Sequence, residues 1–128
     1  MRVKEVSPAV IADENVLVDL IIDSIRDIKG KRIVKMDMRQ LDDAPASYFI
    51  ICEGESSTQV RAISEQVSSR VKQELDILPS HVEGRTEARW VCVDYFDIVV
   101  HVFYPEVRAF YDLEDFWSDA IFQSFEDD

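Results

Sequence analysis

Two aspartates flank the turn in the stretch WVCVDYFDIVVHVFYP, Asp94 before it and Asp97 after it. Upstream, Gly54 and Ser56 in EGESS stand between an apolar run and a helix-like segment. Nucleotidyltransferases use a Gly-Ser turn of this kind to hold phosphates at a helix start, and strand carboxylates to bind magnesium. These residue types therefore point to a nucleotide-transferring enzyme.

The spacing of the same residues argues against that chemistry. Glu55 puts a negative charge into the candidate phosphate turn. Asp94 and Asp97 are three positions apart, whereas carboxylates on one face of a strand are two apart. No lysine follows Gly54 at the spacing of a P-loop. The sequence thus predicts no catalytic residue, no cofactor and no metal, and the enzyme stays as an alternative.

The histidines and cysteines do not form a site either. His81 and His101 lack metal-ligand spacing with each other or with Cys52 and Cys92. Both thiols lie within apolar runs, where free cysteines behave as small hydrophobes rather than nucleophiles. No disulfide framework, signal-peptide core or apolar stretch of membrane-spanning length is present. We therefore predict a cytoplasmic protein that does not enter membranes.

The charge of the chain predicts what it binds. Asp and Glu total 26 against 14 Lys and Arg, a formal net charge of -12. Direct, general nucleic-acid binding is not expected, because it draws its affinity from basic side chains. A basic protein is the complementary partner. No Lys or Arg follows Arg108, and the segment after it holds seven acidic residues: Asp112, Glu114, Asp115, Asp119, Glu126, Asp127 and Asp128.

Hydrophobic periodicity predicts the first half of the fold. A helix is expected over 13–29, ended by Gly30 in a left-handed conformation. RIVKMDM alternates as a half-buried strand, and SYFIICEG is a central strand covered on both faces. Ser56 and Gln59 have capping-box spacing for a second helix that runs to Leu75.

The second half is predicted as strands followed by a helix. HVEGR is a short strand, and residues 90–93 and 98–103 form a hairpin of two longer strands. Pro105 starts a helix through EVRAFYDLEDFW, and SDAIFQSFEDD extends that helix or frays. The predicted fold class is α/β, with a mixed β-sheet flanked by α-helices. We expect an N-terminal extension (1–12), one α/β domain (13–117) and an acidic, Phe-containing tail (118–128).

Sheet packing explains most of the hairpin but not Trp90, which begins a strand beside polar GRTEAR. Tyr104, Tyr111 and Trp117 add aromatic side chains near the same end of the domain. Aromatic residues at the border of a sheet are favoured anchors of protein interfaces. The residues alone thus favour an acidic binding module whose partner they do not name.

Several motifs resemble the ribosomal silencing factor family, RsfS or Iojap. Lys29-Gly30 follows the first helix, and SYFIICEGESSTQV is a Tyr-Phe strand that leads into a Ser-Ser helix start. Further on come EG, Trp90, VD, DIVVHVF and a run of spaced residues: Arg108, Tyr111, Leu113, Glu114 and Trp117. The resemblance spans about residues 13–117 and is dense enough to be specific.

The resemblance implies a sandwich related to nucleotidyltransferases but without their catalytic residues. It implies that the chain binds the large ribosomal subunit through ribosomal protein uL-fourteen and sterically blocks joining of the small subunit. Translation would then be repressed under nutrient limitation. The implied partner-binding residues are Trp90, Val91, Arg108, Tyr111, Leu113 and Glu114. The free protein is also expected to be able to form a homodimer. An alternative to the silencing function is that of an acidic adaptor for another basic protein.

Two departures from the family pattern stand out. Many relatives have Gly between the hairpin aspartates where this chain has Phe96, so the turn is not expected to use a glycine conformation. The tail is expected to lie beyond the usual family end. Its Phe122 and Phe125 leave three roles open, namely capping the core, extending an interface or supporting self-association.

Overall fold

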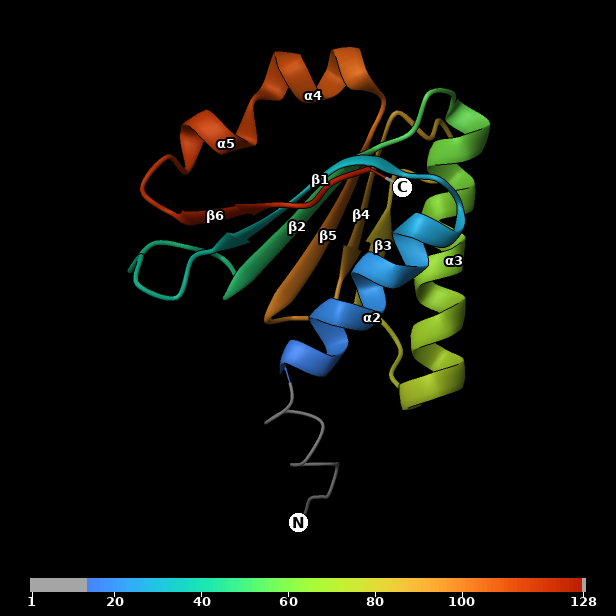
Figure 1. Cartoon of the computed structure of the whole chain (residues 1–128), viewed down its shortest axis with the longest axis horizontal. Coiled ribbons are helices and arrows are strands. Elements are labelled where there is room, and N and C mark those ends of the chain that lie inside the picture. The colour runs from blue at the N-terminus through green and yellow to red at the C-terminus, as the bar shows by residue number, and fades with distance from the viewer. Residues whose placement is uncertain (1–13, 128) are drawn as a thin grey trace.

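The strands form one six-stranded sheet in the order β3-β4-β5-β2-β1-β6 (Figure 1). Residues 14–127 are the part of the chain that the computed structural model describes. β2 and β5 pair in parallel, and the other neighbouring strands pair antiparallel. The mixed sheet and its helices confirm the predicted α/β class. The elements in chain order are α2 (Glu14–Asp27), β1 (Lys31–Asp37), β2 (Tyr48–Glu53), α3 (Ser57–Leu75), β3 (His81–Glu83), β4 (Trp90–Asp94), β5 (Ile98–Phe103), α4 (Pro105–Tyr111), α5 (Leu113–Phe116) and β6 (Ile121–Ser124).

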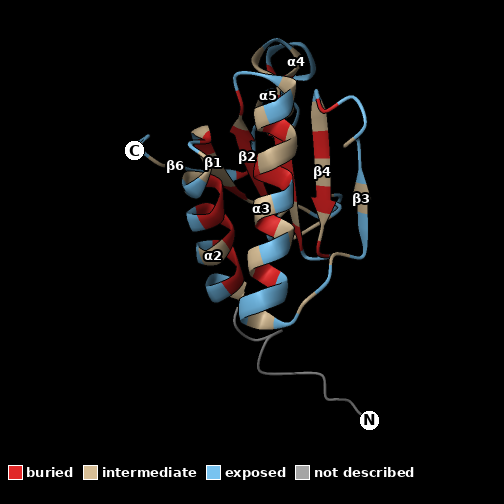
Figure 2. Ribbon diagram, turned by 90° about the vertical axis from the view of Figure 1, so that its right-hand side faces the viewer, coloured by how far each residue is buried: buried red, intermediate tan, exposed pale blue. Residues whose placement is uncertain are grey.

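The sheet separates two hydrophobic clusters. α2 and α3 lie side by side over one face and turn their buried residues toward it (Figure 2). On the other face, the second cluster includes Met36, Phe49 and Phe103, with partly buried side chains from α4 and α5 packed against it. The central strand β2 contributes to both clusters, because successive side chains of a strand point to opposite faces. SYFIICEG is thus confirmed as a strand covered on both faces.

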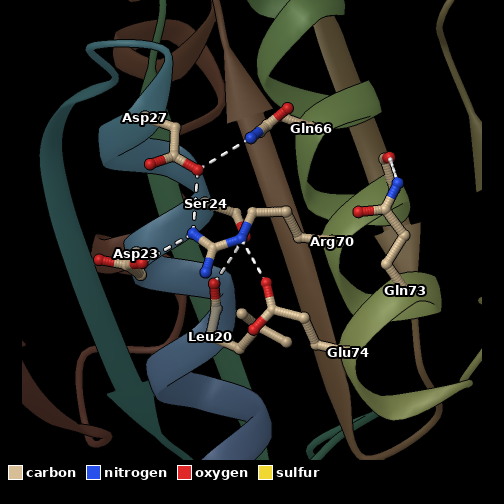
Figure 3. Close-up of polar contacts among 9 residues, drawn as sticks. Leu20, Asp23, Ser24, Asp27, Gln66, Arg70, Gln73 and Glu74 are labelled. Atoms are coloured by element: carbon tan, nitrogen blue, oxygen red, sulfur yellow. Dashed lines mark hydrogen bonds and ion pairs between the residues drawn. The ribbon is translucent and has the colours of Figure 1, made fainter.

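Arg70 of α3 ties the two covering helices together at the surface. Its guanidinium donates to Asp23 at 2.7 Å and Asp27 at 2.9 Å on α2, and to Glu74 at 2.7 Å on α3 (Figure 3). Gln66 donates to the same Asp27 carboxylate at 2.8 Å. This hydrogen bond, together with those from Arg70, lowers the pKa of Asp27. The cluster fixes how α2 and α3 lie against each other.

The start of α3 has the predicted Ser56 cap, but the Gln59 side chain reaches back to Glu55, one residue before the N-cap. Ser56 Oγ accepts from the Gln59 N–H at 3.1 Å, and Gln59 Oε1 accepts from the Glu55 N–H at 2.6 Å. The Gln59 amide also donates to the carbonyl oxygens of Ile28 and Lys29 after α2. These N–H groups of the candidate phosphate turn therefore donate to side chains of the turn itself, so they are not available to a phosphate.

Two predicted helix ends are wrong in detail. The left-handed residue after α2 is Lys29, with φ of 62°, rather than Gly30. Gly30 is needed for space, because a Cβ there would lie 2.3 Å from Ile25 Cγ2. The expected single helix from Pro105 is broken at Asp112, whose φ of 48° separates α4 from α5. The break changes the direction of the chain, which then continues across the sheet.

The end of the chain is neither an extended helix nor a frayed segment. β6 pairs antiparallel with β1, so it continues the sheet at its outer edge. Phe125 packs against the cluster beneath α2 and lies under the Arg26 guanidinium at 5.8 Å. Of the three roles left open, capping the core therefore describes Phe125. Phe122 stays 40% exposed.

The hairpin turn uses a glycine-like conformation without a glycine. Phe96 has φ of 71° and is 76% exposed. Asp94 Oδ1 accepts from the Phe96 N–H at 2.7 Å, and the Asp97 carbonyl oxygen accepts from the N–H groups of Ser47 and Tyr48. The expectation that this turn avoids such a conformation is wrong. The Asp94 side chain and the Asp97 main chain therefore hold the hairpin turn in place.

We expect Phe96→Gly to raise the free energy of unfolding by about 0.5–1 kcal/mol. A left-handed φ costs an L-residue roughly 1–2 kcal/mol, and the added chain entropy of glycine offsets part of the gain. Urea denaturation measures the change as a shift of the midpoint. Phe96→Ala is the control, because it removes the exposed ring but keeps the Cβ. Equal stability of both variants would show that φ is not the cause.

Candidate partner-binding surface

An open cavity of about 460 Å³ lies between the start of β4 and α4. Its floor is aromatic and apolar, from Trp90, Val107 and Tyr111, and its rim is polar, from Thr86, Glu87 and Arg89. Gly84 also lines it, with φ of 96°. A Cβ at Gly84 would lie 2.1 Å from the Trp90 carbonyl oxygen, so glycine brings these two segments together. An apolar floor inside a polar rim is the anatomy of a protein interface.

The Trp90 side chain is partly buried and lies at the floor of this surface, so it does not project into solvent. Its ring stacks on Phe103 with centroids 5.0 Å apart and meets Tyr111 at 4.7 Å. Its Nε1–H donates to His101 Nδ1 at 3.1 Å. Because these contacts belong to the second cluster, we expect Trp90→Ala to lose stability as well as any binding.

His101 supports Trp90 from inside the sheet. Since Nδ1 accepts the indole N–H, the neutral ring carries its proton on Nε2, which is buried with no hydrogen-bond partner among residues 14–127. Burial lowers the pKa of His101 from 6.5 to about 4. If His101 were protonated, Nδ1 would also carry a hydrogen, and this donor would face the Trp90 indole N–H, which is a donor too. The fold therefore favours neutral His101, as a hydrogen-bonded strand residue.

We expect acid to weaken the fold through His101. The folded pKa lies below that of the unfolded chain, so stability is complete near neutral pH and falls as the pH drops from about 6.5 toward 4. His101 should contribute a loss of about 1 kcal/mol between pH 7 and pH 5.5. Urea denaturation at both values measures it against His101→Gln, which keeps an acceptor but does not titrate. An equal loss in both proteins would contradict the assignment.

Arg108 connects α4 to the sheet and to α5. Its guanidinium donates to Glu114 at 2.7 Å, to Glu53 at 3.1 Å and to the Arg32 carbonyl oxygen at 2.8 Å. The residue is 7% exposed. Arg32 adds a second cation 3.4 Å from Glu53. The charges are thus balanced inside the protein, and they fix the position of the helix that carries Tyr111.

The structure divides the six predicted partner-binding residues into two groups. Val91 is fully buried beneath α3 and Arg108 is buried in its ion pairs, so neither offers its side chain to a partner in this conformation. Sequence order placed Val91 beside Trp90, but strand alternation turns the two side chains to opposite faces. Tyr111 is 52% exposed, and Trp90, Leu113 and Glu114 are half-buried around it.

One surface residue was missed by the sequence analysis. Phe110 is 81% exposed and meets Tyr111 edge-on at 5.1 Å. Ending α4 at Tyr111 leaves the Phe110 ring in solvent. The sequence signal that could have revealed Phe110 is its position next to a second aromatic residue, Tyr111, just before an acidic segment.

Comparison with known proteins decides the family. The model of the family "Ribosomal silencing factor during starvation" matches residues 12–128. The chain belongs to the ribosomal silencing factor family. It is 42% identical over 94 residues to ribosomal silencing factor RsfS of Bacillus subtilis, covering 73% of this chain and 78% of the relative. It is 39% identical over 104 residues to RsfS of Halalkalibacterium halodurans, covering 81% and 87%.

A solved structure of the same fold agrees with this assignment. The crystal structure of a Chromobacterium violaceum protein superposes with a TM-score of 0.77 at 35% identity, covering 81% of this chain and 85% of that chain. The ribosomal silencing factor match includes β6, so the expectation that the last residues lie beyond the family's usual end is wrong. Kinship with nucleotidyltransferases stays a prediction.

Three further observations bear on other classes of function. Among residues 14–127, the His, Cys, Asp and Glu side chains form no group of three that would hold a metal ion. None of the helices in that range is long and apolar enough to span a membrane. Burial raises the pKa of Cys52 to about 12 and that of Cys92 to about 11, so both thiols stay protonated near neutral pH.

Proposed function

We propose that this ribosomal silencing factor binds the large ribosomal subunit through ribosomal protein uL-fourteen and represses translation by blocking small-subunit joining. The observation that carries the proposal is the exposed aromatic pair Phe110 and Tyr111, of which Tyr111 lines the cavity together with Trp90. Large aromatic side chains around a partly desolvated pocket are the usual anchors of a protein interface.

Charge supports a basic partner at the same surface. Exposed acids lie on α4 (Glu106), between the two helices (Asp112) and on α5 (Asp115), whereas Arg108 is neutralised internally. Ribosomal proteins are generally basic, so opposite charges would steer the two proteins together. The inhibitory step would be steric: a protein docked at the intersubunit face occupies the place of the small subunit. No bond is made or broken in it, so neither cofactor nor metal is needed.

A joining assay tests the inhibitory step. Light scattering follows association of isolated large and small subunits, with the chain added to the large subunit first or to the small subunit first. We expect joining to fall with increasing chain when it meets the large subunit first. Equal joining rates with and without saturating chain would reject occlusion. Inhibition only after incubation with the small subunit would reject the assigned partner.

A further inference from the structure

β6 presents a free strand edge at the far side of the sheet from Trp90. It pairs with β1 along one side, and no other strand among residues 14–127 pairs with it (Figure 1). The Phe125 N–H donates inward to the Ile33 carbonyl oxygen at 2.9 Å. Because inward and outward residues alternate in an antiparallel ladder, the N–H and C=O groups of Phe122 and Ser124 point outward. These groups are available to another chain.

β6 is only four residues long, but its edge lacks other usual protection against such pairing. Strand edges are commonly blunted by lysine, proline or a bulge. β6 reads Ile-Phe-Gln-Ser, and the Ile121 side chain is 57% exposed and that of Phe122 is 40% exposed. Their partners across the ladder are Asp37 and Met36, so Ile121 lies on the face of α2 and Phe122 on the face of α5. A pairing strand would find an apolar side chain on each face.

The charges around β6 are mainly acidic. Asp119 precedes the strand, and Glu126 and Asp127 follow it. Asp42 and Asp43 line a neighbouring open cavity of about 360 Å³ together with Asp119, Phe116 and Trp117. The nearby cations are engaged with other groups of the protein. Lys35 lies over the Tyr48 ring at 5.5 Å, and the Arg32 side chain lies 3.4 Å from Glu53. Arg39 donates to Asp37 at 2.8 Å, and Arg26 donates to the Glu126 carbonyl oxygen at 3.0 Å.

We propose that the outer edge of β6 binds a basic, extended segment of a partner protein, which adds a seventh strand to the sheet. Main-chain hydrogen bonds to Phe122 and Ser124 would hold the segment, and its Lys or Arg side chains would meet the flanking acids. A second copy of this chain fits less well, because two β6 edges would bring two acidic clusters together. The site is distinct from the surface around Trp90 and does not depend on the proposed function.

Titration with a synthetic peptide tests the proposal by NMR. The probe is an eight-residue peptide of alternating lysine and valine, and the control probe replaces lysine by glutamate. We expect saturable shifts at β6 with the lysine peptide, and at least tenfold slower amide exchange at Phe122 and Ser124. The glutamate peptide should produce neither. No saturable shift at β6, or equal binding of both peptides, would overturn the proposal.

Variants of the edge separate backbone pairing from general attraction. Ser124→Pro removes an outward N–H and spares the ladder to β1, so it should abolish the slowed exchange, whereas Ser124→Ala should bind like wild type. Unchanged α2 and α3 amide signals establish that the proline variant is folded. If the proline variant is not folded, Ile121→Lys is tested in its place. Ile121→Lys should weaken peptide binding at least tenfold. Retained binding in the folded edge variant, or protection of β6 in a dimer without peptide, would overturn the proposal.

Discussion

Arg108→Ala should lower the free energy of unfolding by about 3–5 kcal/mol, the range for breaking a buried ion pair by removing one partner. The substitution leaves the Glu53 and Glu114 carboxylates without their shared guanidinium and the Arg32 carbonyl oxygen without a donor. α4 would lose its link to both β2 and α5. Urea denaturation followed by far-ultraviolet circular dichroism measures the change.

Arg108→Lys is the matched control for this loss. It keeps a positive charge between Glu53 and Glu114 but cannot donate to three acceptors in the planar fork of a guanidinium. Its stability should therefore fall between those of wild type and Arg108→Ala. An alanine variant within about 0.5 kcal/mol of wild type, the usual range for a surface substitution, would show that the buried network does not hold α4.

Tyr111→Ala should weaken binding to isolated large subunits by at least about 30-fold, which corresponds to about 2 kcal/mol. Half of the Tyr111 side chain faces solvent, so its removal should cost the fold little. It would remove one wall of the cavity over Trp90 and a ring that meets Phe110. Co-sedimentation over a range of subunit concentrations gives the affinity, and a thermal melt of the same preparation gives the stability.

Leu78→Ala provides the control for Tyr111→Ala. Leu78 is 69% exposed, and it lies between α3 and β3, next to the Asp94 end of β4 rather than the Trp90 end. We expect this variant to bind as tightly as wild type. If Tyr111→Ala also binds like wild type, or if both variants are equally weakened, the interface is not where we place it.

Local patterns predicted the elements that carry their own signals. The Ser56 cap, the buried run of β2 and the alternation of β1 each describe contacts within a few residues, and all three occur as expected. The same reasoning missed what depends on distant partners. β6 forms a strand because it pairs with the outer edge of β1. Nothing in the sequence of Ile121–Ser124 shows that this edge is there to pair with.

The candidate site shows the same division. Trp90 and Tyr111 were found because aromatic residues beside polar sequence suggest an interface. Arg108 was assigned to the partner because it belongs to the same run of family residues. Its acceptors are Glu114, six positions away, and Arg32 and Glu53, which are more than fifty positions away. Only the folded chain shows that its charge is used internally. Val91 was expected to pack in the sheet, and only the family resemblance added it to the partner-binding residues. Its buried side chain fits the first expectation.

The most direct test of the central claim is binding to separated ribosomal subunits. The wild-type chain is incubated with purified large or small subunits, and each mixture is sedimented through a sucrose cushion. We expect the chain to pellet with large subunits in a saturable, near-equimolar amount, and uL-fourteen added in excess to release it. Pelleting with small subunits alone, or with neither, would contradict the assigned partner. Large-subunit binding that free uL-fourteen does not compete would contradict the assigned contact.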